Sequence, residues 1–564
     1  MAWFLWLIGS LSILLAIFAH ALGIDHTPDW GTSRWFMLWA GLVITLTGCF
    51  WRWKKPISSW WHSTAFNHWF RRTTVGLFSS RPVHTLRELR FIRWFFQPGE
   101  TSVRWMALVT VLIGSLTAWW LVTAGTMNDF SHTTYYYDRL AGGFSHGQLS
   151  LLEEPDARLA ELSNPYDYRE RGDIPIIWDA SYYQGQYYLY WGPVPALLIC
   201  IIKPFALPPI GDLSLVLFFV IGCMAVQAWL LVLIHRRWFA DLPAGLAIPP
   251  LLAGTFCVPL LWQLPRPSIY EAAITGGQFF WLLGLAFIFL SFDSEKGRVG
   301  RLILAGLCLA AAVGCRANLL VQSAALLACL LYLFFSRPAW RRDLFFGGVA
   351  FALGLAALGW YNLARFGSIL ETGYSYQFTG PAAISLVGGM LYSPGYMLPN
   401  FFNAFLRPPL FDAEFPFIHS PWITEAMWPF FIHLPEKYYY SEPISGLLFT
   451  CPFLVFFPAA FARKRRSPEI IGLGVVALVS ILVNLAFITT FMRYLLDFSP
   501  LLILLAAMGF WQLNGKPSPA RGFLGLVLGI TTAIIGILLA VAGPNNNILN
   551  SNPALFQWLA GLFQ

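Results

Sequence analysis

The sequence has few charged residues. Asp, Glu, Lys and Arg make up 11% of its 564 residues, whereas soluble domains carry about 25%. Hydrophobic residues make up 57%, and apolar runs of about 20 residues recur, each long enough to cross a hydrocarbon core of about 30 Å. The composition excludes a soluble globular domain and predicts an all-α polytopic membrane protein, because barrel strands would alternate over about ten residues instead.

Several chemical motifs are also missing. The sequence has no GxxxxGK[ST] loop, no HExxH and no CxxC, which argues against ATP-driven transport by this chain alone and against zinc proteolysis. One GxSxG, "GFSHG" at Gly143–Gly147, lacks the strand-turn-helix context of a serine nucleophile. The eight cysteines lie in or beside apolar segments, so no disulfide framework is predicted. The net charge of +8 comes from basic loops, as in membrane proteins, and predicts no nucleic-acid partner.

The basic loops decide the topology. The segment from Lys54 to Arg104 is rich in arginine and poor in acids, so we expect it in the cytoplasm. The segment 192–208 is apolar but short and rich in proline. If it lies in the membrane interface, five basic loops face the cytoplasm together: 235–238, 294–298, 337–342, 463–466 and 514–521. The prediction is a multi-pass protein of the cell membrane with about thirteen transmembrane helices and a cytoplasmic N-terminus.

The predicted spans lie at about 3–23, 34–53, 105–125, 212–234, 243–264, 272–292, 301–315, 317–335, 344–364, 446–460, 469–491, 498–513 and 522–543. They divide the chain into four regions. Residues 1–104 hold two transmembrane helices and the basic segment, and 105–380 form a core with a large extracytoplasmic first loop at 126–211. Residues 381–445 form another extracytoplasmic loop, and 446–564 hold the C-terminal transmembrane helices and an outer tail.

The first outer loop carries the candidate acids. "SHTTYYYDRLAGGFSHGQLSL" predicts an amphipathic helix and then a turn, with Asp129 and Asp138 near its start. An acid beside a low-dielectric surface can act as a general base. Nine residues apart, the two do not share a helical face, so we expect one of them in a site. An interfacial helix with a tyrosine belt is the alternative interpretation of this segment.

Two later turns bring charge to the same side. "RPSIYEAA" places Arg266, Tyr270 and Glu271 at the outer end of a helix hairpin, where each unpaired ionisable group costs about 2.5–3.5 kcal/mol. Arg316, in "GCRANLL", interrupts an apolar run that must kink or form two spans. At an outer turn its planar fork suits a phosphate. A structural ion pair at the first turn and snorkelling at the second are equally weighted alternatives.

Three further segments add candidates. "NLARFGSILETGYSYQF" places Arg365 after a span, either in a site or in an ordinary interfacial loop. In "MRYLLDF", Arg493 and Asp497 are four residues apart, and we favour an i,i+4 ion pair. "WDASYYQGQYYLYWGPVP" offers Asp179 and several aromatic faces, and ends in a Gly-Pro turn that suits the start of a helix.

These motifs together resemble the GT-C fold glycosyltransferases, which include protein O-mannosyltransferases, lipid A aminoarabinose transferases and oligosaccharyltransferases. "YYYDRLAGGFSHGQLSL" is similar to the family's first outer helix, and "RPSIYEAA" to its Arg-x-x-x-x-Asp turn, with Glu271 at the acid. The resemblance covers about residues 105–380. The family's acidic pair falls on Thr133 and Thr134, and "YWGPVPALLICIIKPF" lacks the lysine of the family's Lys-Pro-Pro-Leu.

The resemblance implies a membrane glycosyltransferase that moves a sugar from a polyprenyl-phosphate donor to a glycan, lipid or protein acceptor on the extracytoplasmic face, with inversion. The predicted catalytic residues are Asp129, ahead of Asp138, and Glu271. The predicted substrate-binding residues are His132, Tyr137, Asp179, Tyr182, Tyr183, Arg266, Tyr270, Arg316, Arg365 and Arg493. Asp129 and Glu271 could hold Mg²⁺ or Mn²⁺ if they lie close together.

Two other functions stay open. A transporter or flippase of a lipid-linked saccharide would also place charges and broken helices in the membrane. It would show a central cavity with two-fold pseudosymmetry, whereas a transferase would show a cavity walled by the first loop. A non-catalytic member of the same fold is the third possibility, since the acidic pair is replaced.

Overall fold

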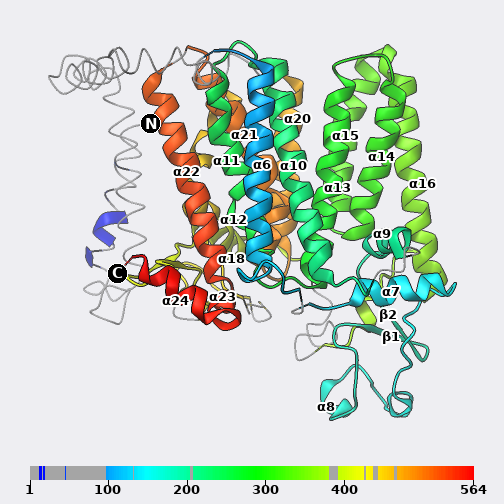
Figure 1. Cartoon of the computed structure of the whole chain (residues 1–564). Coiled ribbons are helices and arrows are strands. Elements are labelled where there is room, and N and C mark those ends of the chain that lie inside the picture. Colours follow the sequence, from blue (N-terminus) through cyan, green and yellow to red (C-terminus); the bar gives the residue numbers. More distant parts are fainter. Residues whose placement is uncertain are drawn as a thin grey trace. The chain divides into compact units, whose positions relative to one another are not determined.

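The computed structural model describes residues 97–130, 133–203, 208–379, 391–424, 427–435, 438, 442–462, 467–516 and 518–563, with residues 10, 12–15, 17, 18 and 45. The chain divides into two compact units, one of Met1–Phe96 with Ile423–Leu434 and one of Gln97–Trp422 with Pro435–Gln564. All the elements labelled in Figure 1 belong to the second unit. The four-region division predicted from the sequence stays a prediction.

Transmembrane helices dominate the second unit. Nine helical segments of the described residues are long and apolar enough to cross a membrane: α6 (Glu100–Val122), α10 (Asp212–Trp238), α11 and α12 with the turn before them (Ala244–Leu261), α13 (Ile269–Ser291), α14 (Arg298–Cys315), α15 (Leu319–Ser336), α16 (Arg341–Phe366) with the turn before it, α20 (Pro468–Ala486) and α22 (Pro519–Ala542). Two shorter apolar helices, η9 (Pro452–Phe461) and α21 (Ser499–Leu513), match two more predicted spans.

The all-α polytopic class is therefore confirmed. Nine of the eleven spans predicted from residue 105 onward are matched by helical segments of sufficient length, and η9 and α21 lie at the other two predicted positions but are shorter. The predicted spans at 3–23 and 34–53 fall almost wholly outside the described residues, so the total of about thirteen stays a prediction. The break at Arg316 is resolved in favour of two spans, because α14 ends at Cys315 and α15 begins at Leu319.

Ion pairs join the helix ends at one side of the bundle. Arg236, in the last turn of α10, contacts Glu100 of α6 at 3.4 Å and also pairs with Asp293, just after α13. Arg298 of α14 lies 3.6 Å from Asp343 of α16. These basic ends lie opposite the outer-loop elements (Figure 1), as the charge-based prediction of a cytoplasmic side requires.

Glycines let the helices approach closely. A Cβ on Gly306 of α14 would lie 2.2 Å from the carbonyl oxygen of Gly347 in α16. A Cβ on Gly192 would lie 2.0 Å from the carbonyl oxygen of Gly314. The second contact brings the end of the outer loop against the α14–α15 turn. Substituting either glycine would force backbone segments apart.

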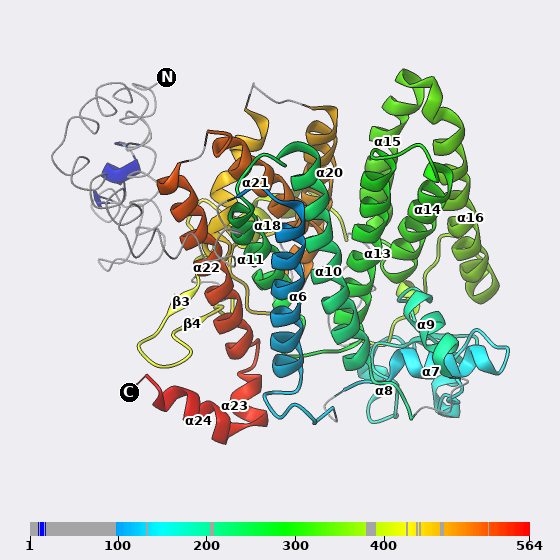
Figure 2. The same cartoon turned by 45° about the horizontal axis from the view of Figure 1, so that its top comes forward.

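The outer loop folds into short elements at the other end of the bundle, where α13 begins and α16 ends (Figures 1 and 2). They are α7 (Tyr136–Ser145), η1 (Ala157–Ala160), α8 (Tyr168–Arg171), β1 (Ser181–Tyr183), β2 (Gln186–Tyr188) and α9 (Val194–Ile202). Helix α7 confirms the predicted outer helix. Helix α9 has nine residues, about 14 Å, which is too short to cross the membrane and agrees with the interfacial prediction.

The β-hairpin was not predicted. Strands β1 and β2 pair antiparallel, with Tyr182 opposite Tyr187. The turn residues Gln184 and Gly185 have φ of 48° and 76°, which is the conformation of a type I′ hairpin turn. The signal was present as two tyrosine pairs on either side of Gln-Gly, but a tyrosine-rich membrane segment also fits an interfacial belt.

The C-terminal part adds short elements between its spans. They are η5 (Tyr374–Tyr376), η6 (Pro394–Tyr396), α18 (Met397–Phe401), η7 (Phe402–Leu406), β3 (Leu410–Phe411), β4 (Ile418–His419), α19 (Leu447–Thr450), η11 (Met492–Asp497), α23 (Asn547–Ser551) and α24 (Pro553–Gly561). Strands β3 and β4 pair antiparallel.

Candidate functional site

A cavity of about 1430 Å³ lies at the loop end of the spans. Seven parts of the second unit line it: the outer loop, the start of α13 with the residues before it, the turn between α14 and α15, the end of α16 with the segment after it, residues 391–392, residues 438 and 442, and residues 487–494. Segments far apart in sequence therefore converge on one site. Its walls carry both acidic and basic side chains together with many aromatic rings.

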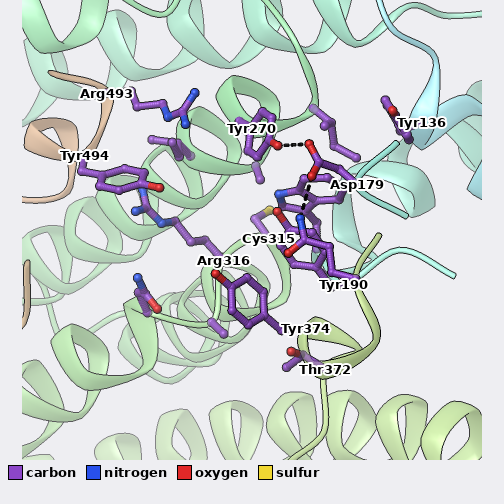
Figure 3. A pocket seen from close by; sticks show the side chains of 18 of the residues that line it. Tyr136, Asp179, Tyr190, Tyr270, Cys315, Arg316, Thr372, Tyr374, Arg493 and Tyr494 are labelled. Atoms are coloured by element: carbon purple, nitrogen blue, oxygen red, sulfur yellow. Dashed lines mark hydrogen bonds between the residues drawn. The ribbon is translucent and has the colours of Figure 1, made fainter. Parts of the chain in front are cut away.

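Asp179 is the outer-loop acid that lines this cavity. Its side chain is 6% exposed. Its Oδ1 accepts a hydrogen bond from Gln377 Nε2 at 2.8 Å, and Oδ2 accepts one from the hydroxyl of Tyr270 (Figure 3). Burial raises the pKa of the Asp179 carboxyl, while these two hydrogen bonds and the charge of Arg493 act in the opposite direction. Asp179 is thus a carboxyl held in one orientation, with an elevated proton affinity.

Aromatic rings surround Asp179. Trp191 stacks on Tyr190 with ring centroids 3.9 Å apart, and meets Tyr270 edge-on at 5.2 Å. Tyr374 lies edge-on to Tyr190 at 5.2 Å. Such faces suit the stacking of a flat apolar or sugar surface, and the hydroxyls supply hydrogen bonds at the rim. The segment "WDASYYQGQYYLYWGPVP", in which the sequence indicates several aromatic faces, contributes Tyr190 and Trp191 to the cavity lining.

Arg493 is held between two glutamates. Its Nη1 lies 3.1 Å from Glu271 and its Nη2 lies 3.0 Å from Glu442. The guanidinium also lies over the ring of Tyr270, 4.7 Å from the centroid. The expected i,i+4 pair of Arg493 with Asp497 is wrong: η11 is a 3₁₀ helix, and its two charged residues pair with other elements. Both terminal nitrogens of Arg493 are therefore occupied by protein.

Arg316 is only partly engaged. Its Nη1 contacts Asp497 Oδ1 at 2.9 Å, and its guanidinium lies 4.8 Å from the centroid of the Tyr494 ring. The side chain is 11% exposed and lines the cavity. Figure 3 shows Arg316, Arg493 and Tyr494 across the cavity from Asp179 and Tyr136. Within the described part of the chain, no hydrogen bond is seen for Nε or Nη2 of Arg316, so that edge can take a ligand.

The two remaining predicted cations differ sharply. Arg365 is buried, and its guanidinium donates to the carbonyl of Leu189 at 2.6 Å, to Asn362 Oδ1 at 2.9 Å and to the carbonyl of Tyr361 at 3.3 Å. These contacts clamp the outer loop to α16. Arg266, in contrast, is exposed at the cavity rim, and among the described residues it makes no ion pair.

Glu271 has both carboxylate oxygens engaged. Oε2 accepts from the backbone N–H of Ser268 at 3.1 Å and from its hydroxyl, which forms a capping box at the start of α13. Oε1 pairs with Arg493. Glu271 is not among the side chains lining the cavity. Its placement fits the structural alternative that the sequence left open.

The other predicted residues lie away from the cavity lining. Asp138, on α7, pairs with Lys203 at 3.1 Å, and Asp129 lies half-buried just after α6. The Tyr137 side chain is fully buried. Tyr182 stacks on Phe378 with centroids 5.3 Å apart, and Tyr183 contacts Tyr376 at 4.6 Å, so both join the hairpin to the segment after α16. His132 lies outside the described residues.

Three residues of the site region were not predicted. Asp212, at the start of α10, accepts from the Thr134 hydroxyl at 2.6 Å and from the backbone N–H groups of Tyr136 and Tyr137 at 3.0 and 3.2 Å. It anchors α7, and its place before an apolar run is a helix-start signal. Glu442 and Gln377 contact residues far away in sequence. Contacts between residues so far apart in sequence cannot be predicted from a local sequence pattern.

The acidic residues of the site do not form a cation site. Among the described residues, no group of three or more His, Cys, Asp or Glu side chains is placed to bind a metal ion. Asp129 does not line the cavity and Glu271 is saturated by its own contacts. The residues present do not fit the predicted Mg²⁺ or Mn²⁺ site.

Comparison with known proteins gives similarity in structure alone. No family model and no curated protein matches the sequence. The chain is similar to the oligosaccharyltransferase of Archaeoglobus fulgidus in its apo form, with a TM-score of 0.44, 14% identity, and coverage of 78% of this chain and 56% of that one. It is similar to ArnT from Cupriavidus metallidurans bound to undecaprenyl phosphate, with a TM-score of 0.42, 14% identity, and coverage of 74% and 62%.

A third match is the archaeal oligosaccharyltransferase AglB from A. fulgidus in complex with an inhibitory peptide and a dolichol-phosphate, with a TM-score of 0.43, 13% identity, and coverage of 78% and 57%. The chain thus spans 56–62% of the length of these three structures. The matches include oligosaccharyltransferases, which the sequence resemblance named. At this level of similarity, the chemistry of the chain has to be read from its own residues.

Proposed function

We propose that this membrane protein is a glycosyltransferase that moves a sugar from a lipid-phosphate donor to an acceptor hydroxyl or amide in the loop-end cavity. The observation that carries the proposal is the opposition of one oriented carboxyl, Asp179, to the partly free Arg316 across a single cavity (Figure 3). The cavity of about 1430 Å³ exceeds the roughly 300–1,000 Å³ of ordinary small-molecule sites, which suits a sugar attached to a lipid.

Asp179 serves as the general base in this proposal. It takes the proton of the acceptor while the acceptor atom attacks the anomeric carbon, and the bond from that carbon to the phosphate oxygen breaks. The electron pair leaves with the lipid phosphate, so a single displacement inverts the anomeric centre. A raised pKa brings the carboxyl nearer to the range in which a base is effective at neutral pH. Asp179, which lines the cavity, therefore replaces Asp129 and Asp138 as the proposed base.

The leaving phosphate needs positive charge that the protein has not already neutralised. Arg316 has a free edge and Arg266 has no ion pair among the described residues, so these two are assigned to the phosphate. The guanidinium groups of Arg365 and Arg493 already bind protein groups, so these two residues are assigned a structural role in the cavity walls. A polyprenyl-phosphate donor requires no nucleotide-binding loop, and the sequence has none.

The position of the cavity favours transfer over transport. A flippase needs a path through the bundle, whereas this cavity is lined by the first loop and by helix ends on one side. The positive-inside rule predicts that this side is extracytoplasmic, and the proposed reaction therefore takes place on the outer face of the cell membrane.

The test is a transfer assay on the full-length protein in lipid nanodiscs. Polyprenyl-phosphate sugars carrying a radiolabel are supplied with total membrane glycans, lipids and proteins as acceptors. We expect label to move to an acceptor and free polyprenyl phosphate to accumulate in equal amount. Movement of intact donor across proteoliposomes without transfer would instead establish the flippase. If no donor gives either transfer or movement, that result would support the non-catalytic alternative.

A further inference from the structure

The segment after α16 is docked onto the outer loop beside Asp179. The backbone N–H of Asp179 donates to the carbonyl of Phe378 at 2.8 Å, and the N–H of Phe378 donates back to the carbonyl of Ala180 at 2.8 Å. Ser181 and Gln377 form an antiparallel bridge. Residues 377 and 378 therefore extend the small sheet of the outer loop by one short edge, and they fix the turn at Asp179, whose φ is 62°.

The same segment reaches the carboxyl. Gln377 donates to Oδ1 of Asp179, and Tyr270 from α13 donates to Oδ2. Each oxygen thus has one donor from the protein and keeps lone-pair capacity for a proton or a substrate group. The charged and titratable neighbours are Arg493 from η11, Tyr136 from α7 and Tyr190 from the outer loop. Gln377 supplies one uncharged donor from the segment after α16, and Tyr270 supplies the other from α13.

We propose that Gln377 is a positioning residue that orients the Asp179 carboxylate toward the acceptor and stabilises its ionised form. The inference rests on the proposed function, because it concerns the base of that reaction. It gives the tyrosine-rich segment after α16 a specific role that an ordinary interfacial loop would not have. The geometry also makes the docking of residues 372–379 a condition for activity. Phe378 holds the backbone at Asp179, and Gln377 holds the Asp179 side chain.

The perturbation is Gln377→Glu, tested in the transfer assay as a pH profile of kcat. A second carboxyl 2.8 Å from Asp179 cannot ionise together with it at low cost, so the pair shares a proton. We call the acidic limb the pH range in which kcat falls as the pH is lowered, and we expect its midpoint to rise by about one pH unit or more. At a fixed pH within that range, kcat should fall roughly tenfold for each pH unit that the midpoint rises. KM for the donor should stay within about twofold, because Gln377 donates to Asp179 and, among the described residues, makes no hydrogen bond to Arg266 or Arg316.

The matched control is Gln184→Glu, which adds the same charge at the exposed tip of the β1–β2 hairpin. It should leave the limb in place. Tyr270→Phe provides a second test, since loss of its hydrogen bond also destabilises the ionised carboxylate and should shift the limb in the same direction. It keeps the test decisive if Gln377→Glu does not fold.

The outcomes separate the two levels of the proposal. An unmoved limb in Gln377→Glu, or in Tyr270→Phe if the first variant is unfolded, with an inactive Asp179→Asn variant, would overturn the positioning role and leave the proposed function standing. Full transfer by Asp179→Asn would overturn both. A purely structural role for Gln377 would lower the amount of folded protein while the pH profile of the folded fraction stays unchanged, and that result too would reject the inference.

Discussion

Arg493 offers the sharpest test of how the walls of the cavity are held. It lies between Glu271 and Glu442, and all three side chains are largely buried, with exposures of 12%, 7% and 18%. Replacing Arg493 by Met keeps much of the apolar volume but leaves two carboxylates without their cation. Removing one partner of a buried ion pair costs about 3–5 kcal/mol. We therefore expect the Arg493→Met variant to unfold at a clearly lower temperature than the wild-type protein.

The loss should depend on pH. Burial already raises the pKa of Glu442, and the charge of Arg493 opposes that rise. Without the arginine, the folded-state pKa of Glu442 moves further above its unfolded value, so the folded form binds the extra proton more tightly. The deficit is then largest at pH 8, where the carboxylate is ionised, and shrinks as the pH falls through the raised pKa. Thermal unfolding in detergent at pH 5 and pH 8 measures this directly.

A compensated variant completes the test. Adding Glu271→Gln and Glu442→Gln to Arg493→Met removes the orphaned charges, and glutamine can keep the capping box of α13. The triple variant should regain most of the lost unfolding temperature. If Arg493→Met unfolds like the wild type at both pH values, the arginine is not neutralising these glutamates, and its assignment as a wall residue is wrong.

Other predictions concern single positions. Asp212→Ala should lower the unfolding temperature, because three donors at the start of α7 lose a charged acceptor worth about 1–3 kcal/mol. Gly373→Ala should lower the free energy of unfolding by about 1–3 kcal/mol in a thermal melt, since Gly373 has φ of 100° and a Cβ there would lie 2.6 Å from Phe366. The control is Gly300→Ala, where nothing lies within 4 Å of the added Cβ; it should be neutral or slightly stabilising. Arg316→Ala should lower kcat/KM for the donor at least about tenfold, because a hydrogen bond to a charged group is worth about 1.5–3 kcal/mol, and unchanged donor kinetics would remove it from the phosphate site. The pH profile of the wild type should lose activity on the acidic side at a pH above the ordinary pKa of an aspartate, because Asp179 acts only when ionised and burial raises its pKa.

Much of the fold could be predicted from the sequence because membrane helices appear as apolar runs of about 20 residues. Apolar length gave the spans, and basic loops gave the side on which each turn lies. The same charge argument separated the nine-residue α9 from the predicted spans. The length of the apolar run around Arg316 indicated a kink or two spans, and the structure has two. The β1–β2 hairpin escaped because its tyrosines fit an interfacial belt equally well.

The site was predicted in its parts but not in its pairing. Arg266 and Arg316 were expected on the same side of the membrane, because an ionisable group at membrane depth costs free energy unless it is paired or hydrated. Which acid joins them could not be read from the sequence, because Asp179 is selected by contacts with Gln377, 198 residues away. Spacing could not reveal that Arg493 pairs with Glu442 rather than with Asp497. Pairing across helices is set by packing, and packing leaves no local pattern in a single sequence.

Transfer by the Asp179→Asn variant tests the central claim most directly. The isosteric amide keeps the volume and can still contact Tyr270, but it cannot accept a proton from the acceptor. With a polyprenyl-phosphate sugar that the wild-type protein uses, we expect kcat to fall by about 10²–10⁴-fold, with donor binding preserved, whereas the competing Asp129→Asn variant should transfer at close to the wild-type rate. Wild-type turnover by Asp179→Asn, or its loss in Asp129→Asn, would contradict the account.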